Sequence, residues 1–172
     1  MIMGTIRVFL VSSIDGSYLP LDLQRFHGFD VSEYEKLYRD ADIILVSSVR
    51  YAKLLHGESN QNKQIYEVTK EMSLIPYNDV GINGLTTIDQ LKKVGEKNVI
   101  ILGNDNKLNH YLFEKDWVDE MIVCTFPVVY QRGRRFFPAA LPDKSWNVNG
   151  HQLFNNGIMI TFYKREAAFS DK

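Results

Sequence analysis

The chain has 172 residues, 45% of them hydrophobic, so it is long enough to bury a sizeable core and has the composition of a globular protein. Its 20 basic and 21 acidic side chains give a net charge of -1, which excludes a broad basic surface for nucleic acid or an anionic membrane. No segment reaches the roughly 20 apolar residues of a membrane-spanning helix, and the N-terminus lacks a charged leader followed by an apolar core. We therefore expect one cytoplasmic domain over residues 1–172, with no nucleic acid and no membrane among its partners.

Apolar runs that end in turn-forming residues predict the strands. In chain order they cover residues 6–12, 43–46, 64–69, 99–102 and 121–129. The runs at 43–46 and 99–102 are apolar throughout, as strands buried on both faces require. Asn155, Asn156 and Gly157 predict the turn of a C-terminal hairpin over residues 151–164.

Helical patterns separate these strands. Residues 30–40 begin with capping residues, residues 49–55 form a short segment, and residues 88–94 follow a threonine pair. A further helix begins after the GNDN loop at 103–106, where Leu108, Tyr111 and Leu112 repeat at spacings of three and four. Strands that alternate with helices predict an α/β fold with a parallel central sheet, to which the hairpin adds an antiparallel edge.

Two loops that follow predicted strands are candidates for ligand binding. Ser13-Ile14-Asp15-Gly16 closes the first strand, and Gly103-Asn104-Asp105-Asn106 closes the strand at 99–102. A strand that ends in a tight loop and leads into a helix leaves backbone N–H groups pointing outward, where they attract phosphate. The second loop is therefore the starting point for a phosphate-binding site.

Other chemistry has little support in the sequence. Cys124 is the only cysteine and lies in an apolar run, which indicates a core residue. Asp119 and Glu120 are adjacent on a predicted strand and so point to opposite faces, which favours structural roles over a paired acid/base site. There is no G-x-S-x-G motif and no P-loop. No metal site is expected, because the four histidines lack metal-ligand spacing: His27, His56, His110 and His151.

Four segments occur in a familiar order: SSIDG, ADIILVSSVRY, LNHYLFEKDWVDEM and PVVYQRGRRFF. Together they resemble the dihydrofolate-reductase-like superfamily, and within it the C-terminal reductase domain of the riboflavin biosynthesis protein RibD. The resemblance covers residues 7–164. It implies a central mixed, mostly parallel sheet flanked by helices, with a C-terminal antiparallel hairpin. It also implies that NADPH binds across the carboxyl ends of the strands, often in a homodimer.

The resemblance carries over to individual residues. Asp15 is implied as a substrate contact, although its carboxylate equally suits a turn that accepts neighbouring N–H bonds. Arg25 and His27 are not matched to family residues; because they lie in the stretch that follows this turn, we expect them to line the substrate pocket, with Arg25 as a phosphate contact. Arg50 has a planar fork suited to a 2′-phosphate, and Lys107 places a cation at a helix start. The residues implied at the cofactor are Ser13, Ser47, Ser48, Arg50, Gly103, Asn104, Asp105, Asn106 and Lys107.

The chain departs from the family in its glycines. The family has two or three glycines where this chain has Asn104-Asp105-Asn106, and Gln131 also stands at a family glycine. These side chains fill space near the pyrophosphate, and Asp105 adds a like charge, whereas the asparagines are able to donate hydrogen bonds in place of the backbone.

Two functions follow from these features. The first is an NADPH-dependent reductase for a pterin-like or ribosylaminopyrimidine-type substrate, of the dihydrofolate reductase or 5-amino-6-(5-phosphoribosylamino)uracil reductase type. Its chemistry is hydride transfer, which relies on positioning and water exclusion, and no catalytic side chain is identified. The second is a family member that has lost dinucleotide binding and acts as a small-ligand binder or dimeric interaction protein.

Overall fold

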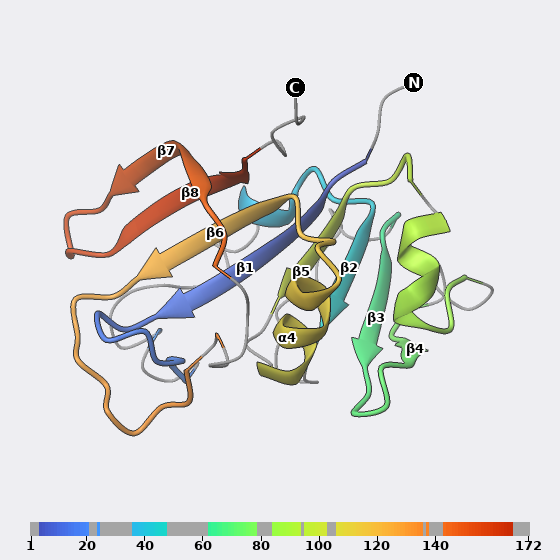
Figure 1. The fold of residues 1–172 in the computed structure, drawn as a ribbon, viewed down its shortest axis with the longest axis horizontal. Helices are drawn as coiled ribbons and strands as arrows, with labels where there is room; N and C mark the ends of the chain where they lie inside the picture. The colour runs from blue at the N-terminus through green and yellow to red at the C-terminus, as the bar shows by residue number, and fades with distance from the viewer. Residues whose placement is uncertain are drawn as a thin grey trace.

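The computed structural model of the protein describes residues 4–20, 24, 36–47, 62–78, 84–93, 95–102, 106–135, 137 and 143–166. These residues form one eight-stranded sheet in the order β4-β3-β2-β5-β1-β6-β8-β7 (Figure 1). The run from β3 to β6 is parallel, whereas β4 pairs antiparallel with β3, and β8 pairs antiparallel with both β6 and β7. The predicted mixed, mostly parallel sheet with an antiparallel C-terminal hairpin is confirmed.

The bounds of the elements follow the apolar runs of the sequence. The strands are β1 (Ile6–Ser12), β2 (Ile43–Val46), β3 (Gln64–Val68), β4 (Leu74–Pro76), β5 (Val99–Leu102), β6 (Glu120–Thr125), β7 (Trp146–Leu153) and β8 (Met159–Arg165). Two helices are the 3-10 helix η4 (Ile88–Lys93) and the α-helix α4 (Asn106–Glu114). Of the helix predicted over 30–40, residues 36–38 are described and helical. The helix predicted over 49–55 lies outside the described residues.

The parallel strands are buried on both faces, and alternate residues enter different cores. Leu10 of β1 packs on one face with Leu108 and Leu112 of α4. Phe9 belongs to the core on the opposite face, together with Cys124 of β6, whose side chain is fully buried as predicted. Because each fully buried leucine contributes about 1.5–3 kcal/mol, the two leucines fix α4 firmly against the sheet.

Three elements differ from the sequence prediction. Strand β6 ends at Thr125 rather than Val129, because Pro127 has no N–H with which to continue the ladder. Strand β7 begins at Trp146, five residues before the predicted start of the hairpin. The helix over 88–93 has 3-10 geometry. The hairpin turn itself is confirmed, because Gly157 adopts a φ of 86° and the Phe154 N–H donates to the Ile158 carbonyl at 2.9 Å.

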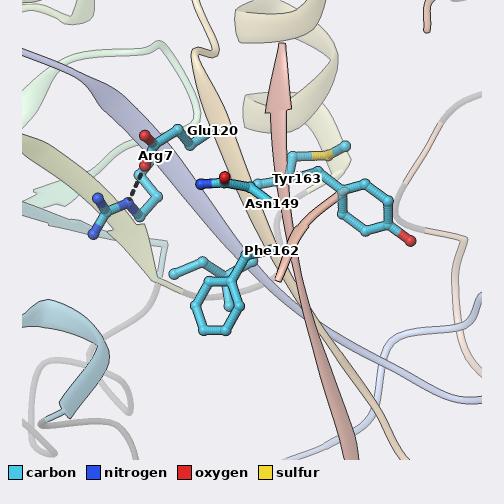
Figure 2. A pocket seen from close by; sticks show the side chains of 7 residues that line it. Arg7, Glu120, Asn149, Phe162 and Tyr163 are labelled. Atoms are coloured by element: carbon cyan, nitrogen blue, oxygen red, sulfur yellow. Dashed lines mark hydrogen bonds and ion pairs between the residues drawn. The ribbon is translucent and has the colours of Figure 1, made fainter. Parts of the chain in front are cut away.

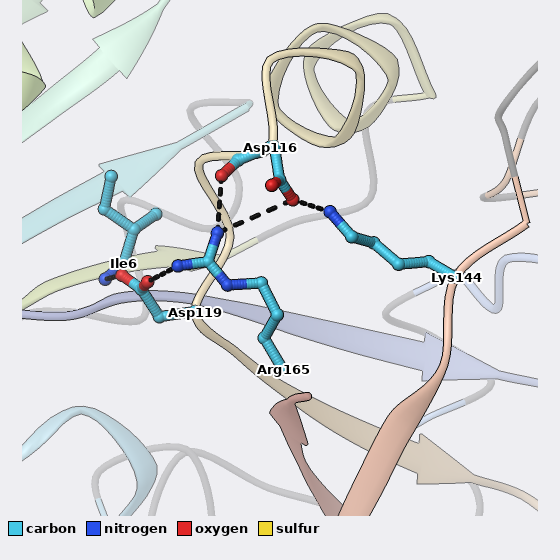
Figure 3. A network of polar contacts seen from close by, with 5 residues as sticks. All are labelled: Ile6, Asp116, Asp119, Lys144 and Arg165. Atoms are coloured by element: carbon cyan, nitrogen blue, oxygen red, sulfur yellow. Dashed lines mark hydrogen bonds and ion pairs between the residues drawn. The ribbon is translucent and has the colours of Figure 1, made fainter. Parts of the chain in front are cut away.

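A polar network closes the amino edge of the central strands (Figure 3). Asp119 Oδ2 accepts the backbone N–H of Ile6 at 2.9 Å, and its Oδ1 accepts from Arg165 Nη2 at 2.9 Å. Arg165 Nη1 donates to the Asp116 carbonyl at 2.6 Å, and the Asp116 carboxylate forms an ion pair with Lys144. The network joins the start of β1 to the end of β8. Asp119 therefore has the structural role that the sequence predicts.

Candidate functional site

The carboxyl ends of the parallel strands lie at one edge of the sheet, and this edge is the candidate site. Strands β2, β5, β1 and β6 are consecutive neighbours, and Figure 1 shows the arrowheads of β1, β2 and β6 toward the lower part of the view. The loop after β1 and the loop after β6 meet here, because the Ile14 N–H donates to the Val128 carbonyl at 2.8 Å. Open α/β sheets bind ligands outside this edge.

The turn that follows β1 is held by its own side chains. The buried Ser13 hydroxyl accepts the backbone N–H of Ser17 at 3.0 Å and donates to the Asp15 carboxylate. Gly16 adopts a φ of 78°, a conformation that side chains rarely tolerate. Ser13, which was predicted at the cofactor, thus uses its hydroxyl inside the turn. Its predicted contact with a cofactor stays a prediction.

Asp15 ties this turn to the loop after β6. Its Oδ1 accepts the backbone N–H of Tyr130 at 2.8 Å, and its Oδ2 accepts the Ser17 hydroxyl at 3.2 Å. The Ser13 hydroxyl, followed by the Tyr130 N–H, holds the pKa of Asp15 below its ordinary value, although the side chain is exposed. Both carboxylate oxygens are therefore engaged within the protein. This geometry supports the turn interpretation of Asp15, and the substrate contact stays a prediction.

The loop after β6 is packed tightly against the same turn. The Tyr18 N–H donates to the Arg134 carbonyl at 2.9 Å, and Ser17 forms an isolated antiparallel bridge with Arg135. A Cβ on Gly133 would lie 2.7 Å from the Tyr18 carbonyl oxygen, so only glycine permits this approach. Gly133 therefore allows the loop after β6 to pack closely against the turn after β1.

The other predicted cofactor residues fall partly within the described residues. The Ser47 N–H donates to the Leu102 carbonyl at 3.3 Å, so the ends of β2 and β5 are adjacent. Asn106 begins α4, and the Lys107 ammonium donates to the Lys70 carbonyl in the β3–β4 turn at 2.6 Å. The predicted site residues outside the described residues are Ser48, Arg50, Gly103, Asn104, Asp105, Arg25 and His27.

Sequence reasoning missed a buried polar pair near this edge. Asn109 on α4 is fully buried, and its Nδ2 donates to the Tyr18 hydroxyl at 3.1 Å. No hydrogen-bond donor of the described residues reaches its Oδ1. An unpaired buried acceptor costs about 1–3 kcal/mol and usually has a specific reason. The sequence feature that could have indicated this pair is the position of Asn109 directly after Leu108, a residue whose side of the helix faces the sheet.

The described residues also form a pocket at the opposite, amino edge of β1 and β6 (Figure 2). Its volume is about 290 Å³, and Arg7 Nε donates to Glu120 Oε2 at 2.8 Å in its wall. The register of β7 shifts between Val148 and Gly150, and the intervening Asn149 lines the pocket. A β-bulge commonly re-aims a side chain in this way. None of the described residues that the sequence predicted for ligand binding lines this pocket.

The described residues contain neither a membrane-spanning helix nor a cluster of metal-binding side chains. Within them, no helix is long and apolar enough to cross a bilayer. Nor do these residues contain a group of three or more histidine, cysteine or acidic side chains placed to hold a metal ion.

Solved structures share the fold of this chain. A pyrimidine reductase-like protein from Corynebacterium diphtheriae NCTC aligns with a TM-score of 0.70 and 14% identity, over 95% of this chain and 92% of that one. A Shewanella sp. PV-4 protein assigned to riboflavin biosynthesis aligns with a TM-score of 0.68 and 18% identity, over 95% and 99%. Acinetobacter baumannii RibD, form 1, aligns with a TM-score of 0.64 and 14% identity, over 96% of this chain and 59% of that chain.

These likenesses confirm, at the level of the fold, the predicted resemblance to the reductase domain of RibD. A scan against protein-family models finds no match, and a search of the curated proteins finds none either.

Proposed function

We propose that the chain is an NADPH-dependent reductase that transfers a hydride to a pterin-like or ribosylaminopyrimidine-type substrate. The observation that carries the proposal is the meeting of four parallel strand ends with the fixed turn at 13–16, in a fold shared with a pyrimidine reductase-like protein. The carboxyl edge of such a sheet is the usual place for a dinucleotide and its substrate.

The residues at this edge fit a dinucleotide. Helix α4 has nine residues, and its first turn offers backbone N–H groups of the kind that bind phosphate. Ser47 follows β2, and its N–H donates to the Leu102 carbonyl at the end of β5, so this half-buried residue lies at the same edge of the sheet. The open Oδ1 of Asn109 adds a buried acceptor beside Tyr18. NADPH, when bound, would supply the hydride.

The contribution of the chain would be positioning and the exclusion of water, which is what hydride transfer requires of a protein. Asp15 fixes the turn after β1 to the loop after β6, and both of its oxygens are occupied. A turn held by four side-chain hydrogen bonds presents a rigid surface to the reacting ring. No side-chain nucleophile is needed.

A second function rests on the GNDN loop. If Asn104 and Asp105 block the pyrophosphate, the chain is a small-ligand binder or a dimeric interaction protein instead of a reductase. In both versions we propose a homodimer in the cytoplasm, with a heterocyclic small molecule as the ligand of the reductase.

Calorimetric titration with NADPH and, separately, with NADH tests the proposal. Micromolar NADPH binding with much weaker NADH binding would support the reductase and a 2′-phosphate contact. No binding of either would support the second function. The double variant Asn104→Gly/Asp105→Gly identifies the cause. Tighter NADPH binding indicates obstruction by these side chains, and weaker binding indicates that they donate hydrogen bonds to phosphate.

A further inference from the structure

The pocket at the amino edge of β1 and β6 lies on one face of the sheet, beside the bulge in β7 (Figure 2). Arg7 of β1 pairs with Glu120 of β6. Two residues further along β6, Ile122 pairs with Phe162 of β8. Because residues two apart on a strand share a face, these four side chains lie on the same side of the sheet. Together with Asn149, they form what we call the amino-edge pocket.

The protein uses only part of the hydrogen-bonding capacity of this pocket. Arg7 Nε donates to Glu120 Oε2 at 2.8 Å, and this is the one hydrogen bond that either side chain forms with the described residues. The two Nη groups of Arg7, Oε1 of Glu120 and the side-chain amide of Asn149 have no partner among these residues. Figure 2 shows the three polar side chains grouped together, whereas Tyr163 points away from them. Donors and acceptors therefore remain for a ligand.

The amino-edge pocket is partly shielded from water and has an apolar floor. The side chains of Arg7 and Glu120 are only 29% and 23% exposed. Hydrogen bonds formed in such a site are stronger than hydrogen bonds formed in open water. Ile122 is buried and Phe162 is half-buried, so the two provide an apolar surface on which a flat ring can lie.

Charge and size restrict what the pocket can bind. The charges of Arg7 and Glu120 cancel, so a charged ligand would meet one group of like sign at close range. The volume of about 290 Å³ is at the lower end of the range for small-molecule sites, which is about 300–1,000 Å³. The donor at Arg7 Nη next to the acceptor at Glu120 Oε1 complements a lactam edge, in which a ring carbonyl neighbours a ring N–H. An uncharged heterocycle of nucleoside size fits these limits.

The amino-edge pocket is separate from the edge proposed for hydride transfer. Strand β1 reaches both places, with Arg7 near its start and Ser13 directly after its end. At about 3.3 Å per residue, these two residues are roughly 20 Å apart. A molecule in the pocket therefore does not contact the turn at 13–16, and it is a second ligand in addition to the substrate.

We propose that the amino-edge pocket binds an uncharged planar heterocycle through its lactam edge. The ring carbonyl accepts a hydrogen bond from Arg7 Nη, and the ring N–H donates to Glu120 Oε1. The ring lies on Phe162, and the amide of Asn149 contacts it from the exposed rim of the pocket. This ligand site does not depend on the proposed reductase function.

Inosine, a nucleoside with a lactam edge, is the probe for the test. The matched comparison is 1-methylinosine, in which a methyl group replaces the ring N–H. The readout is the shift of the Asn149 side-chain amide and Arg7 guanidinium signals in NMR titrations. We expect the wild type to bind inosine about tenfold more tightly than 1-methylinosine, because the latter has no donor for Glu120. Benzoate should also bind more weakly than inosine, because Glu120 repels its carboxylate.

Two asparagines of β7 provide a matched pair of variants. Asn147 and Asn149 are both exposed, and of the two only Asn149 lines the pocket. We expect Asn149→Ala to weaken inosine binding and Asn147→Ala to leave it unchanged. Arg7→Met should lose about tenfold in affinity, because it removes the donors for the ring carbonyl. If Arg7→Met does not fold, the comparison of the two asparagine variants still decides the test.

Four outcomes would overturn the proposal. They are no binding of inosine by the wild type, equal affinity for 1-methylinosine, equal effects of the two asparagine variants, and tighter binding of benzoate than of inosine. Signal shifts at the turn over residues 13–16 without shifts at Asn149 would place inosine in the proposed substrate site and refute the second site.

NADPH affinity separates this inference from the proposed function. It should be the same in Asn149→Ala as in the wild type, and a loss would place the dinucleotide at the amino-edge pocket and contradict the proposal. The inosine titration needs neither NADPH nor turnover, so a failure of the reductase function leaves the test of the pocket intact.

Discussion

Replacement of Asp119 tests how the central strand is anchored. Its carboxylate accepts the Ile6 N–H and the Arg165 Nη2, each at 2.9 Å. Hydrogen bonds to a charged group contribute about 1.5–3 kcal/mol. The side chains of Asp119 and Arg165 are 28% and 30% exposed, so water screens the pair and the lower end of that range applies. Because Asp119→Ala removes two such bonds, each contributing about 1–1.5 kcal/mol, we expect it to lower the free energy of unfolding by about 2–3 kcal/mol.

Asp119→Asn should cost only about 1 kcal/mol, because asparagine keeps an acceptor for Ile6 and loses the charge opposite Arg165. Urea unfolding followed by circular dichroism measures both values. Glu96→Ala is the control, because Glu96 is exposed and forms no hydrogen bond or ion pair with other described residues. A double-mutant cycle with Arg165→Met should give a coupling energy of about 0.5–1 kcal/mol. The reasoning fails if Asp119→Ala is no more destabilising than Glu96→Ala.

Three further predictions concern other contacts. The pKa of Asp15 is lowered in the fold, so its carboxylate stabilises the protein above pH about 4, and that contribution disappears as the pH falls through the folded-state pKa. Asp15→Asn should therefore have a lower urea midpoint than the wild type at neutral pH. A difference between the two midpoints that is equally large in acid would contradict this reasoning. Gly133→Ala should cost about 1–3 kcal/mol in the same assay, whereas Gly95→Ala, with open space around its Cβ, should be close to neutral. Lys144→Met should change the free energy of unfolding by less than about 1 kcal/mol, because its partner Asp116 is 56% exposed and burial lowers the pKa of Lys144. A larger loss of stability would contradict this reasoning about the surface ion pair.

The sequence predicts the parallel half of the sheet well because burial on both faces leaves a simple pattern. Strands β2 and β5 are apolar at every position, and their predicted bounds are those of the structure. Strand β7 shows the opposite case. Its sequence, WNVNGHQL, is largely exposed and polar, so apolar periodicity does not reveal its first half. The strand predicted at β6 was too long because the apolar residues continue after Thr125. The apolar pattern does not reveal that Pro127 lacks the N–H needed for pairing.

The candidate site was only partly predictable for a different reason. The turn at 13–16 was identified from its residue types, yet one hydrogen-bond partner of Asp15 is Tyr130, 115 positions away. Local propensity contains no information about such a contact. The buried Asn109 was missed because its partner Tyr18 lies in a loop 91 positions earlier. Sequence reasoning thus identified the strand ends and the turn that form the candidate site, and the tertiary contacts revealed how its loops are held together.

The central place of β1 has a consequence for how the protein folds. Ile6 pairs with Val99, and Arg7 pairs with Glu120, so both neighbours of β1 come from the second half of the sequence. Because the ribosome adds about 5–20 residues per second, β5 and β6 are synthesised on the order of ten seconds after this apolar strand. Closing such long loops also slows the search for the native pairing. A nascent chain that stops before β5 would expose both edges of β1, and chaperone binding or aggregation should be greatest for chains of that length.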